Sequence, residues 1–232
     1  MKRFYDKVDV AGSNDGHIVT LDGRPIHSPS HNPLILPSHE LAEAVAAEWA
    51  AQEEKVNLAA MPLMRLAGIA IDDTATRPAA VVEAIAAYGA TDLTCYRAES
   101  PPDLAARQQL RWQPLLDWAA DRHGVALAVA VGVTPIRQPD ESLAALRRAV
   151  AVDGPFRLSG LYAATACCGS VVIALALRDG EIDVDAAWSA AQLDEDFQIE
   201  KWGEDEEAAD RRRNLRTDLD AAARLLELCA AG

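Results

Sequence analysis

Residues 15–49, DGHIVTLDGRPIHSPSHNPLILPSHELAEAVAAEW, contain the change of pattern that decides the fold. Two Asp-Gly pairs, at 15–16 and 22–23, are typical of tight turns between antiparallel strands, and they flank two short runs with strand character, 17–21 and 24–27. Prolines then exclude a helix as far as residue 37; they stand at 25, 29, 33 and 37. Residues 4–37 are therefore predicted to form a small β unit, which must pack on the rest of the chain to be stable.

From Ser38 onward the pattern becomes helical. Ser38 is a suitable helix N-cap, and apolar residues recur at helical spacing through about residue 52. Further helices are predicted from Met61 to 73, from Pro78, from Pro101 to Gly124, and over 140–152, 158–178, 184–202 and 207–230. Residues 125–131 fit either a strand or an extended link. We expect an α+β fold, with a small N-terminal β domain (1–37) packed on a larger, mainly α-helical C-terminal domain (38–232).

The negative charge is concentrated in one stretch. The chain carries a formal net charge of −14 over 232 residues, and residues 179–210 hold thirteen Asp or Glu against Lys201 alone. No basic face is available to neutralise phosphates, so nucleic acid is a poor partner. An acidic patch fits a basic protein surface, or it simply keeps the protein soluble.

The motifs of the common cofactor sites are absent from the sequence. It has neither a glycine-rich dinucleotide fingerprint nor a Walker-type phosphate loop, so we expect no nucleotide cofactor. Four cysteines without paired spacing favour neither a disulfide framework nor a zinc site, and they fit a reducing cytosol. His27, His31 and His39 are interpreted as surface histidines, because prolines prevent a helix that would let the first two share a metal.

One uncharged run is long enough to raise the question of whether it spans a membrane. Leu158–Leu177 has the length of a membrane span, but it contains several Ser, Thr, Gly and Ala residues. We therefore predict a central buried helix and no membrane insertion.

The stretch Trp188–Gly203, WSAAQLDEDFQIEKWG, is predicted to form a helix with one unusual carboxylate. At about 100° per residue, Glu195 falls within roughly 60° of Trp188, Ile199 and Trp202. The neighbouring acids Asp194, Asp196 and Glu200 point elsewhere and are interpreted as ordinary solvent-facing charges. A carboxylate among large apolar side chains is costly unless a group pairs with it.

Three interpretations of Glu195 follow from the residues alone. An arginine or a backbone amide inside the core could hold it, in which case the stripe is entirely structural. A partner molecule could bind it. A third interpretation is a hydrolase-type enzyme, in which Glu195 and either Asp72 or Asp92 form an acid–base pair in a tryptophan-lined pocket.

Seven short motifs, in order along the chain, resemble one known family. They are LDGRP at 21–25, EW at 48–49, MPL at 61–63, AID at 70–72, TDLTCYRA at 91–98, WQPLLDW at 112–118 and LDEDFQIEKWG at 193–203. Together they resemble the ATP-twelve family of assembly chaperones for the F-one sector of ATP synthase. The family often has glutamates on both sides of the central acid; this chain has Asp194 and Asp196 there and keeps Glu195. Residues 205–232 carry no motif of the family.

The resemblance implies a chaperone and not an enzyme, without metal or nucleotide. It implies binding of the unassembled α subunit, which is then passed to the α/β hexamer. By position in the motif, the partner-binding residues would be Glu195 first, then Trp202, Trp188 and Ile199, with Asp194 and Asp196 beside them. We expect a monomer in a bacterial cytoplasm, or in the mitochondrial matrix if the chain is a processed eukaryotic protein.

Overall fold

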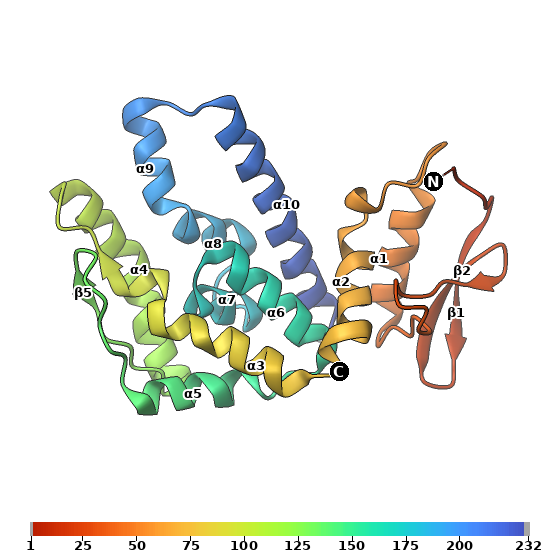
Figure 1. Cartoon of the computed structure of the whole chain (residues 1–232), viewed down its shortest axis with the longest axis horizontal. Helices are drawn as coiled ribbons and strands as arrows, with labels where there is room; N and C mark the ends of the chain where they lie inside the picture. The colour runs from red at the N-terminus through yellow and green to blue at the C-terminus, as the bar shows by residue number, and fades with distance from the viewer. Residues whose placement is uncertain (1, 230–232) are drawn as a thin grey trace. The chain divides into compact units, whose positions relative to one another are not determined.

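The computed structural model describes residues 2–229, so the outermost residues of both predicted domains, and the last residue of the helix predicted over 207–230, lie outside it. The predicted α+β class is confirmed, with a small antiparallel sheet near the N-terminus and a mainly helical remainder (Figure 1). The chain divides into two compact units. Unit 1 takes the chain up to Pro78, Asp153–Gly160 and the chain from Arg224 on, and unit 2 takes Ala79–Val152 and Leu161–Ala223. A domain boundary between 37 and 38 stays a prediction.

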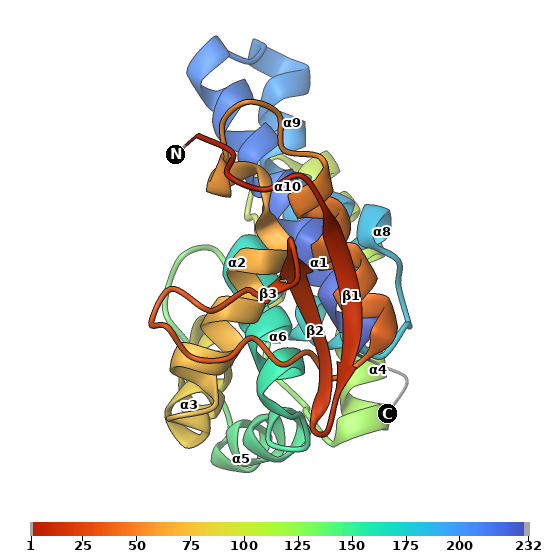
Figure 2. The same ribbon diagram turned by 90° about the vertical axis from the view of Figure 1, so that its right-hand side faces the viewer.

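The sheet of unit 1 is an antiparallel meander of β1 (Val8–Ser13), β2 (Gly16–Leu21) and β3 (Arg24–Pro25). Both predicted hairpins are present, but the first loop is Asn14-Asp15, because Gly16 already pairs with Ser13 as the first residue of β2. In the second turn, Asp22 has φ 49° and Gly23 has φ 78°. A two-residue hairpin loop of type I′ requires a positive φ at both of its residues. Helix α1 (His39–Ala50) packs against β1 and β2 (Figure 2).

Side chains fix the starts of both helices that follow the sheet. The predicted cap of α1 is confirmed, since Ser38 Oγ accepts a hydrogen bond from Leu41 N at 3.1 Å. Helix α2 (Pro62–Ile69) lacks a cap from its own N-cap residue. Glu48 of α1 replaces it, because its carboxylate accepts hydrogen bonds from Leu63 N and Met64 N, each at 2.8 Å. A short turn, η1 (Leu58–Ala60), precedes α2, and a π-helical turn, η2 (Ala70–Thr74), extends it.

Asp72, in η2, anchors the proline-rich loop that follows β3. Its carboxylate accepts hydrogen bonds from Ser28 Oγ at 2.5 Å, Asn32 Nδ2 at 2.8 Å and Ser30 N at 3.0 Å. These bonds, that of Ser28 first, lower the pKa of Asp72 to about 2. The loop therefore depends on an ionised acid distant in sequence.

Unit 2 is built from helices and one two-stranded parallel sheet. Its elements are α3 (Pro78–Ala87), η3 (Tyr88–Thr91), η4 (Leu93–Cys95), β4 (Tyr96–Arg97), α4 (Pro102–His123), β5 (Ala130–Val131), α5 (Asp140–Val150), α7 (Val171–Arg178), α8 (Val184–Ala191) and α9 (Leu193–Trp202). Two further helices, α6 (Pro155–Cys168) and α10 (Glu206–Leu228), have one part in each unit. Strand β5 pairs with β4, so the ambiguous segment 125–131 is mostly an extended link that ends in a short strand.

The prediction of one helix over 158–178 is wrong. Gly169 adopts φ 62°, which ends α6, and Ser170 starts α7 by accepting a hydrogen bond from Ile173 N at 3.0 Å. Helix α7 is buried over nearly its whole length. Within residues 2–229, no helix is both long enough and apolar enough to cross a membrane.

Asp92 is fully buried and connects two segments of unit 2, η4 and the start of α7. Its carboxylate accepts hydrogen bonds from Ser170 Oγ and Thr94 Oγ1, each at 2.7 Å, from Thr94 N at 3.0 Å and from Val172 N at 3.2 Å. Burial raises the pKa of Asp92 although these bonds favour the charged form. The carboxylate holds the start of α7 against η4.

Replacing Asp72 by asparagine should remove part of the acid sensitivity of the fold. The pKa of Asp72 in the folded protein, about 2, lies below its ordinary value of 3.8. Its carboxylate therefore stabilises the fold above about pH 4, and this contribution is lost as the pH falls toward 2. Urea unfolding should show a smaller loss of stability from pH 4 to pH 2 in Asp72→Asn than in wild type. Equal losses would contradict this role.

Replacing Asp92 by alanine should destabilise unit 2 strongly. The change leaves Ser170, Thr94 and the Val172 N–H buried without an acceptor, which should cost about 2–4 kcal/mol. Asp121→Ala, at an exposed acid of α4, is the matched control and should change stability by less than about 0.5 kcal/mol. Chemical denaturation measures both, and a similar small effect of the two variants would show that the Asp92 network is dispensable.

Candidate partner-binding site

The stretch predicted as one helix over 188–203 consists of two helices. Helix α8 ends at Ala191 and α9 begins at Leu193, because Gln192 between them adopts φ −100° and ψ 11°. The projection that aligned Trp188 with Trp202 is therefore wrong across this break. Within α9 the spacing still holds: Glu195, Ile199 and Trp202, at i, i+4 and i+7, share one face. We call these three residues the α9 surface.

The opposite side of α9 attaches it to its neighbours. Leu193 and Phe197 are buried, and α9 packs on α4 and α8 (Figure 1). The Phe197 ring is also 5.2 Å from Arg107 Cζ and 5.2 Å from Lys201 Nζ, measured from the ring centroid. Apolar burial and cation–π contacts thus hold the helix in place and leave its other face free.

Three of the four acids of α9 have partners from flanking helices. Gln108 Nε2 donates to Asp194 at 2.8 Å, Arg212 Nη2 to Asp196 at 2.6 Å, and Arg107 Nη1 to Glu200 at 2.8 Å. Glu200 is exposed, as predicted, whereas Asp194 and Asp196 are half-buried; the sequence did not predict the donors that α4 and α10 bring to all three acids. The pairing with Arg107 also lowers the pKa of Glu200.

Glu195 differs from its neighbours in having no partner. It is half-buried, and its carboxylate forms neither a hydrogen bond nor an ion pair with any of residues 2–229. The arginine or amide that could have held it inside the core is thus not found there. Glu195 lines a shallow hollow of about 310 Å³ with Arg211, Arg212 and Leu215 of α10. Arg212 Nη1 is buried in that neighbourhood and also lacks a hydrogen-bond partner within the described chain.

The two tryptophans of the predicted stripe have different environments. The Trp188 ring is half-buried beneath two arginines of α10, with Arg212 Cζ 5.6 Å and Arg216 Cζ 5.8 Å from its centroid. Trp202, at the end of α9, is 79% exposed. Trp188 therefore belongs to the packing of α8 and α10, while Trp202 is open to solvent.

Sequence reasoning missed Leu110 of α4, which is 81% exposed. It lines a second hollow, of about 480 Å³, together with Arg107, Leu193 and Glu200. The signal was available: the buried residues of α4 include Gln108, Trp112 and Leu115, and Leu110 falls off that face.

The catalytic alternative fails on geometry. Asp72 and Asp92 are both occupied by hydrogen bonds that hold loops and helix starts. The hollow at Glu195 contains neither of them and no tryptophan; its other acid is Asp194. Among residues 2–229, no group of three or more His, Cys, Asp or Glu is placed to hold a metal ion.

Comparison with known proteins identifies the relatives of this fold. Residues 2–120 match the family described as ATP12 chaperone protein, which is the ATP-twelve family of the motifs above. The crystal structure of Atp12 from Paracoccus denitrificans has a TM-score of 0.93 and 38% sequence identity, covering 98% of this chain and 97% of that one. A protein described as a candidate chaperone from Agrobacterium tumefaciens has a TM-score of 0.93 and 42% identity, covering 97% of this chain and 85% of that one.

A eukaryotic relative extends the similarity. The mitochondrial protein atp12 of Schizosaccharomyces pombe is 22% identical over 219 residues, which are 89% of this chain and 75% of that protein. The resemblance drawn from the seven motifs is thereby confirmed.

Proposed function

This chain belongs to the ATP12 chaperone family, and from that premise we propose that it binds the unassembled α subunit of the F-one sector of ATP synthase. It masks the subunit interface of α until the α/β hexamer forms. Membership of the family makes the chain an assembly chaperone for ATP synthase. The observation that carries the finer proposal is the α9 surface, where an exposed tryptophan accompanies a carboxylate without an internal partner.

The physical task of such a chaperone fits this surface. An unassembled subunit exposes an apolar patch that its neighbour later covers, and such a patch tends to aggregate. Masking it takes apolar anchors surrounded by charge, and tryptophan is enriched among the residues that dominate binding energy. Trp202 supplies the anchor, and the half-buried Ile199 extends it along the same face.

Glu195 supplies the charge that selects the partner. Arg212 and Arg107 compensate the charges of Asp196 and Glu200, and Asp194 accepts a hydrogen bond from the neutral amide of Gln108, so all three acids are engaged within the protein. Glu195 can instead accept a charge-assisted hydrogen bond from a cationic side chain of the α subunit. Because the surface is open to water in the free protein, this bond costs little desolvation and stays reversible.

The mode of action is stoichiometric masking without covalent chemistry. Asp194 and Asp196 act indirectly, since their bonds to Gln108 and Arg212 fix α9 between α4 and α10. Trp188 contributes in the same way through its packing under Arg212 and Arg216. The client meets Glu195, Ile199 and Trp202.

Capture of separately expressed subunits tests the function. The full chain is immobilised and mixed with ATP synthase α or β, each with and without ATP. We expect selective capture of α that does not depend on ATP. Capture of neither subunit, or of β alone, would reject the proposal.

Glu195→Gln tests the site. The change removes a charge that has no internal partner, so binding of α should weaken by at least about tenfold, which corresponds to about 1.4 kcal/mol. Stability should fall by no more than about 1 kcal/mol, the favourable effect of an acid in the first turn of a helix. Glu206→Gln, at an exposed acid of α10, is the matched control and should leave binding unchanged.

Trp202→Ala provides an independent test. Its side chain is 79% exposed, so truncation should leave the melting temperature nearly unchanged while it weakens binding of α. If Glu195→Gln or Trp202→Ala lowers stability by several kcal/mol and leaves binding of the folded fraction intact, the α9 surface is structural and not the client site.

A further inference from the structure

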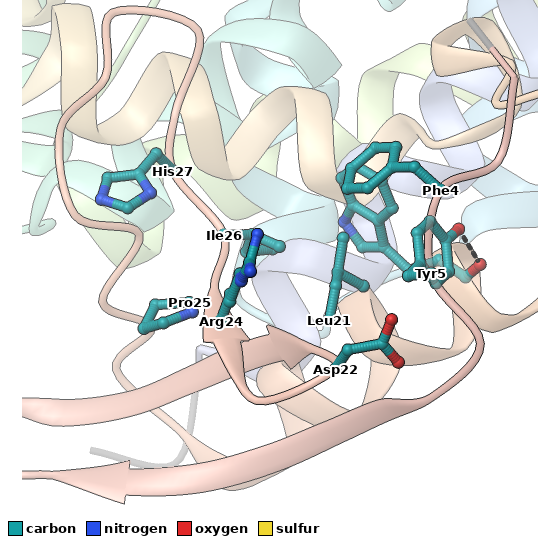
Figure 3. A pocket seen from close by; sticks show the side chains of 9 residues that line it. Phe4, Tyr5, Leu21, Asp22, Arg24, Pro25, Ile26 and His27 are labelled. Atoms are coloured by element: carbon teal, nitrogen blue, oxygen red, sulfur yellow. Dashed lines mark hydrogen bonds between the residues drawn. The ribbon is translucent and has the colours of Figure 1, made fainter.

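A hollow of about 530 Å³ lies in unit 1, formed by residues of that unit alone. Nine residues line it: Phe4, Tyr5, Leu21, Asp22, Arg24, Pro25, Ile26, His27 and Trp49. Phe4 and Tyr5 lie on one side, and Arg24, Ile26 and His27 lie on the other (Figure 3). The assembly role derived above uses none of these residues.

Trp49 lines this hollow and carries an unused hydrogen-bond donor. The residue is only 7% exposed, and its indole Nε1 is buried without a hydrogen-bond partner among the described residues. Tyr5 fixes the ring, because its hydroxyl donates to Trp49 O at 2.7 Å and the two rings pack edge-to-face with centroids 5.6 Å apart. A buried donor without an acceptor costs about 1–3 kcal/mol, so an acceptor supplied from outside would be favoured.

Arg24 brings a second donor. The residue is exposed, and its side chain forms neither a hydrogen bond nor an ion pair with any of residues 2–229. Asp22, the acid at the hollow, is already engaged, since its Oδ1 accepts from Lys7 N at 2.8 Å and from Asp6 N at 3.2 Å. The guanidinium group of Arg24 is therefore free to take a carboxylate from a ligand.

Apolar side chains complete the hollow. Phe4 is 61% exposed, although its ring packs edge-to-face on Tyr5 at a centroid distance of 5.3 Å. Ile26 and Leu21 are buried beside it. Pro25 lies in the edge strand β3 and has no N–H, so a ligand cannot simply extend the sheet there and must be recognised through side chains.

We propose that this hollow is a second docking site for the client, and that it binds an extended peptide segment with a carboxylate next to a large apolar side chain. The carboxylate pairs with Arg24, an acceptor oxygen of the segment takes the Trp49 N–H, and the apolar side chain packs on Phe4 and Ile26. The identification of the ligand as the client rests on the proposed function. The chemical class of the ligand is inferred from the residues of the hollow alone.

Capture of the α subunit by variants of the full chain is the first test. Arg24→Gln should weaken binding about tenfold, and Trp49→Phe, which keeps an aromatic ring but removes the N–H, about three- to tenfold. Arg148→Gln, at an exposed arginine of α5 without a partner in the described chain, is the matched control and should bind as wild type. If wild type captures α and Arg24→Gln captures it equally well, the second site is rejected and the proposed function stands.

An NMR titration tests the site without the client. The indole N–H signal of Trp49 is identified by its loss in Trp49→Phe, and wild type is titrated with the capped dipeptides acetyl-Leu-Asp-amide and acetyl-Leu-Asn-amide. We expect the aspartyl peptide to move the Trp49 signal downfield, the asparaginyl peptide to move it less, and Arg24→Gln to remove the difference. No movement with either peptide would overturn the inference, even if the chain fails to capture α.

Discussion

A buried carboxylate needs hydrogen-bond donors inside the fold, and the helices of unit 2 are arranged around one such carboxylate, that of Asp92. Asp92 is fully buried, and its four hydrogen bonds join η4 to the first turn of α7. Helix α7 is the buried helix on which α4 and α8 pack, so the position of its first turn controls theirs. Because α9 in turn packs on α4 and α8, the surface proposed for the client depends on this one buried acid.

The need of a buried carboxylate for a partner also distinguishes the acids of residues 179–210 from one another. Nine of the thirteen acids in 179–210 have hydrogen-bond or ion-pair partners within the described residues, and the four without are Glu181, Glu195, Glu206 and Glu207. Three of these four are exposed, where water satisfies the charge. Glu195 alone among them is half-buried, beside the arginines of α10. The acids of 179–210 are therefore not equivalent: Glu195 lacks a partner in the described chain and lines a hollow.

Local signals in the sequence predicted local structure well. The Asp22-Gly23 turn and the Ser38 cap each depend on residues a few positions apart, and both are present. The breaks at Gly169 and Gln192 were missed, because apolar periodicity continued across both. Gly169-Ser170 did carry a signal, a helix-ending glycine followed by an N-cap serine, whereas only backbone conformation marks the break at Gln192. The partners of Asp194, Asp196 and Glu200 were missed as well, since each comes from a helix distant in sequence.

The error about the tryptophan stripe changes what the site can do. A continuous helix would have placed Glu195 between two tryptophans, where desolvation would demand a strong internal pair. The break at Gln192 instead moves Trp188 beneath Arg212 and Arg216, and it leaves Glu195 beside an exposed Trp202. A surface of this kind binds through an anchor that water already reaches, so the complex is held without a deeply buried charge pair. A chaperone that must give up its client to a neighbouring subunit needs such a reversible contact, because a buried ion pair would be slow to separate.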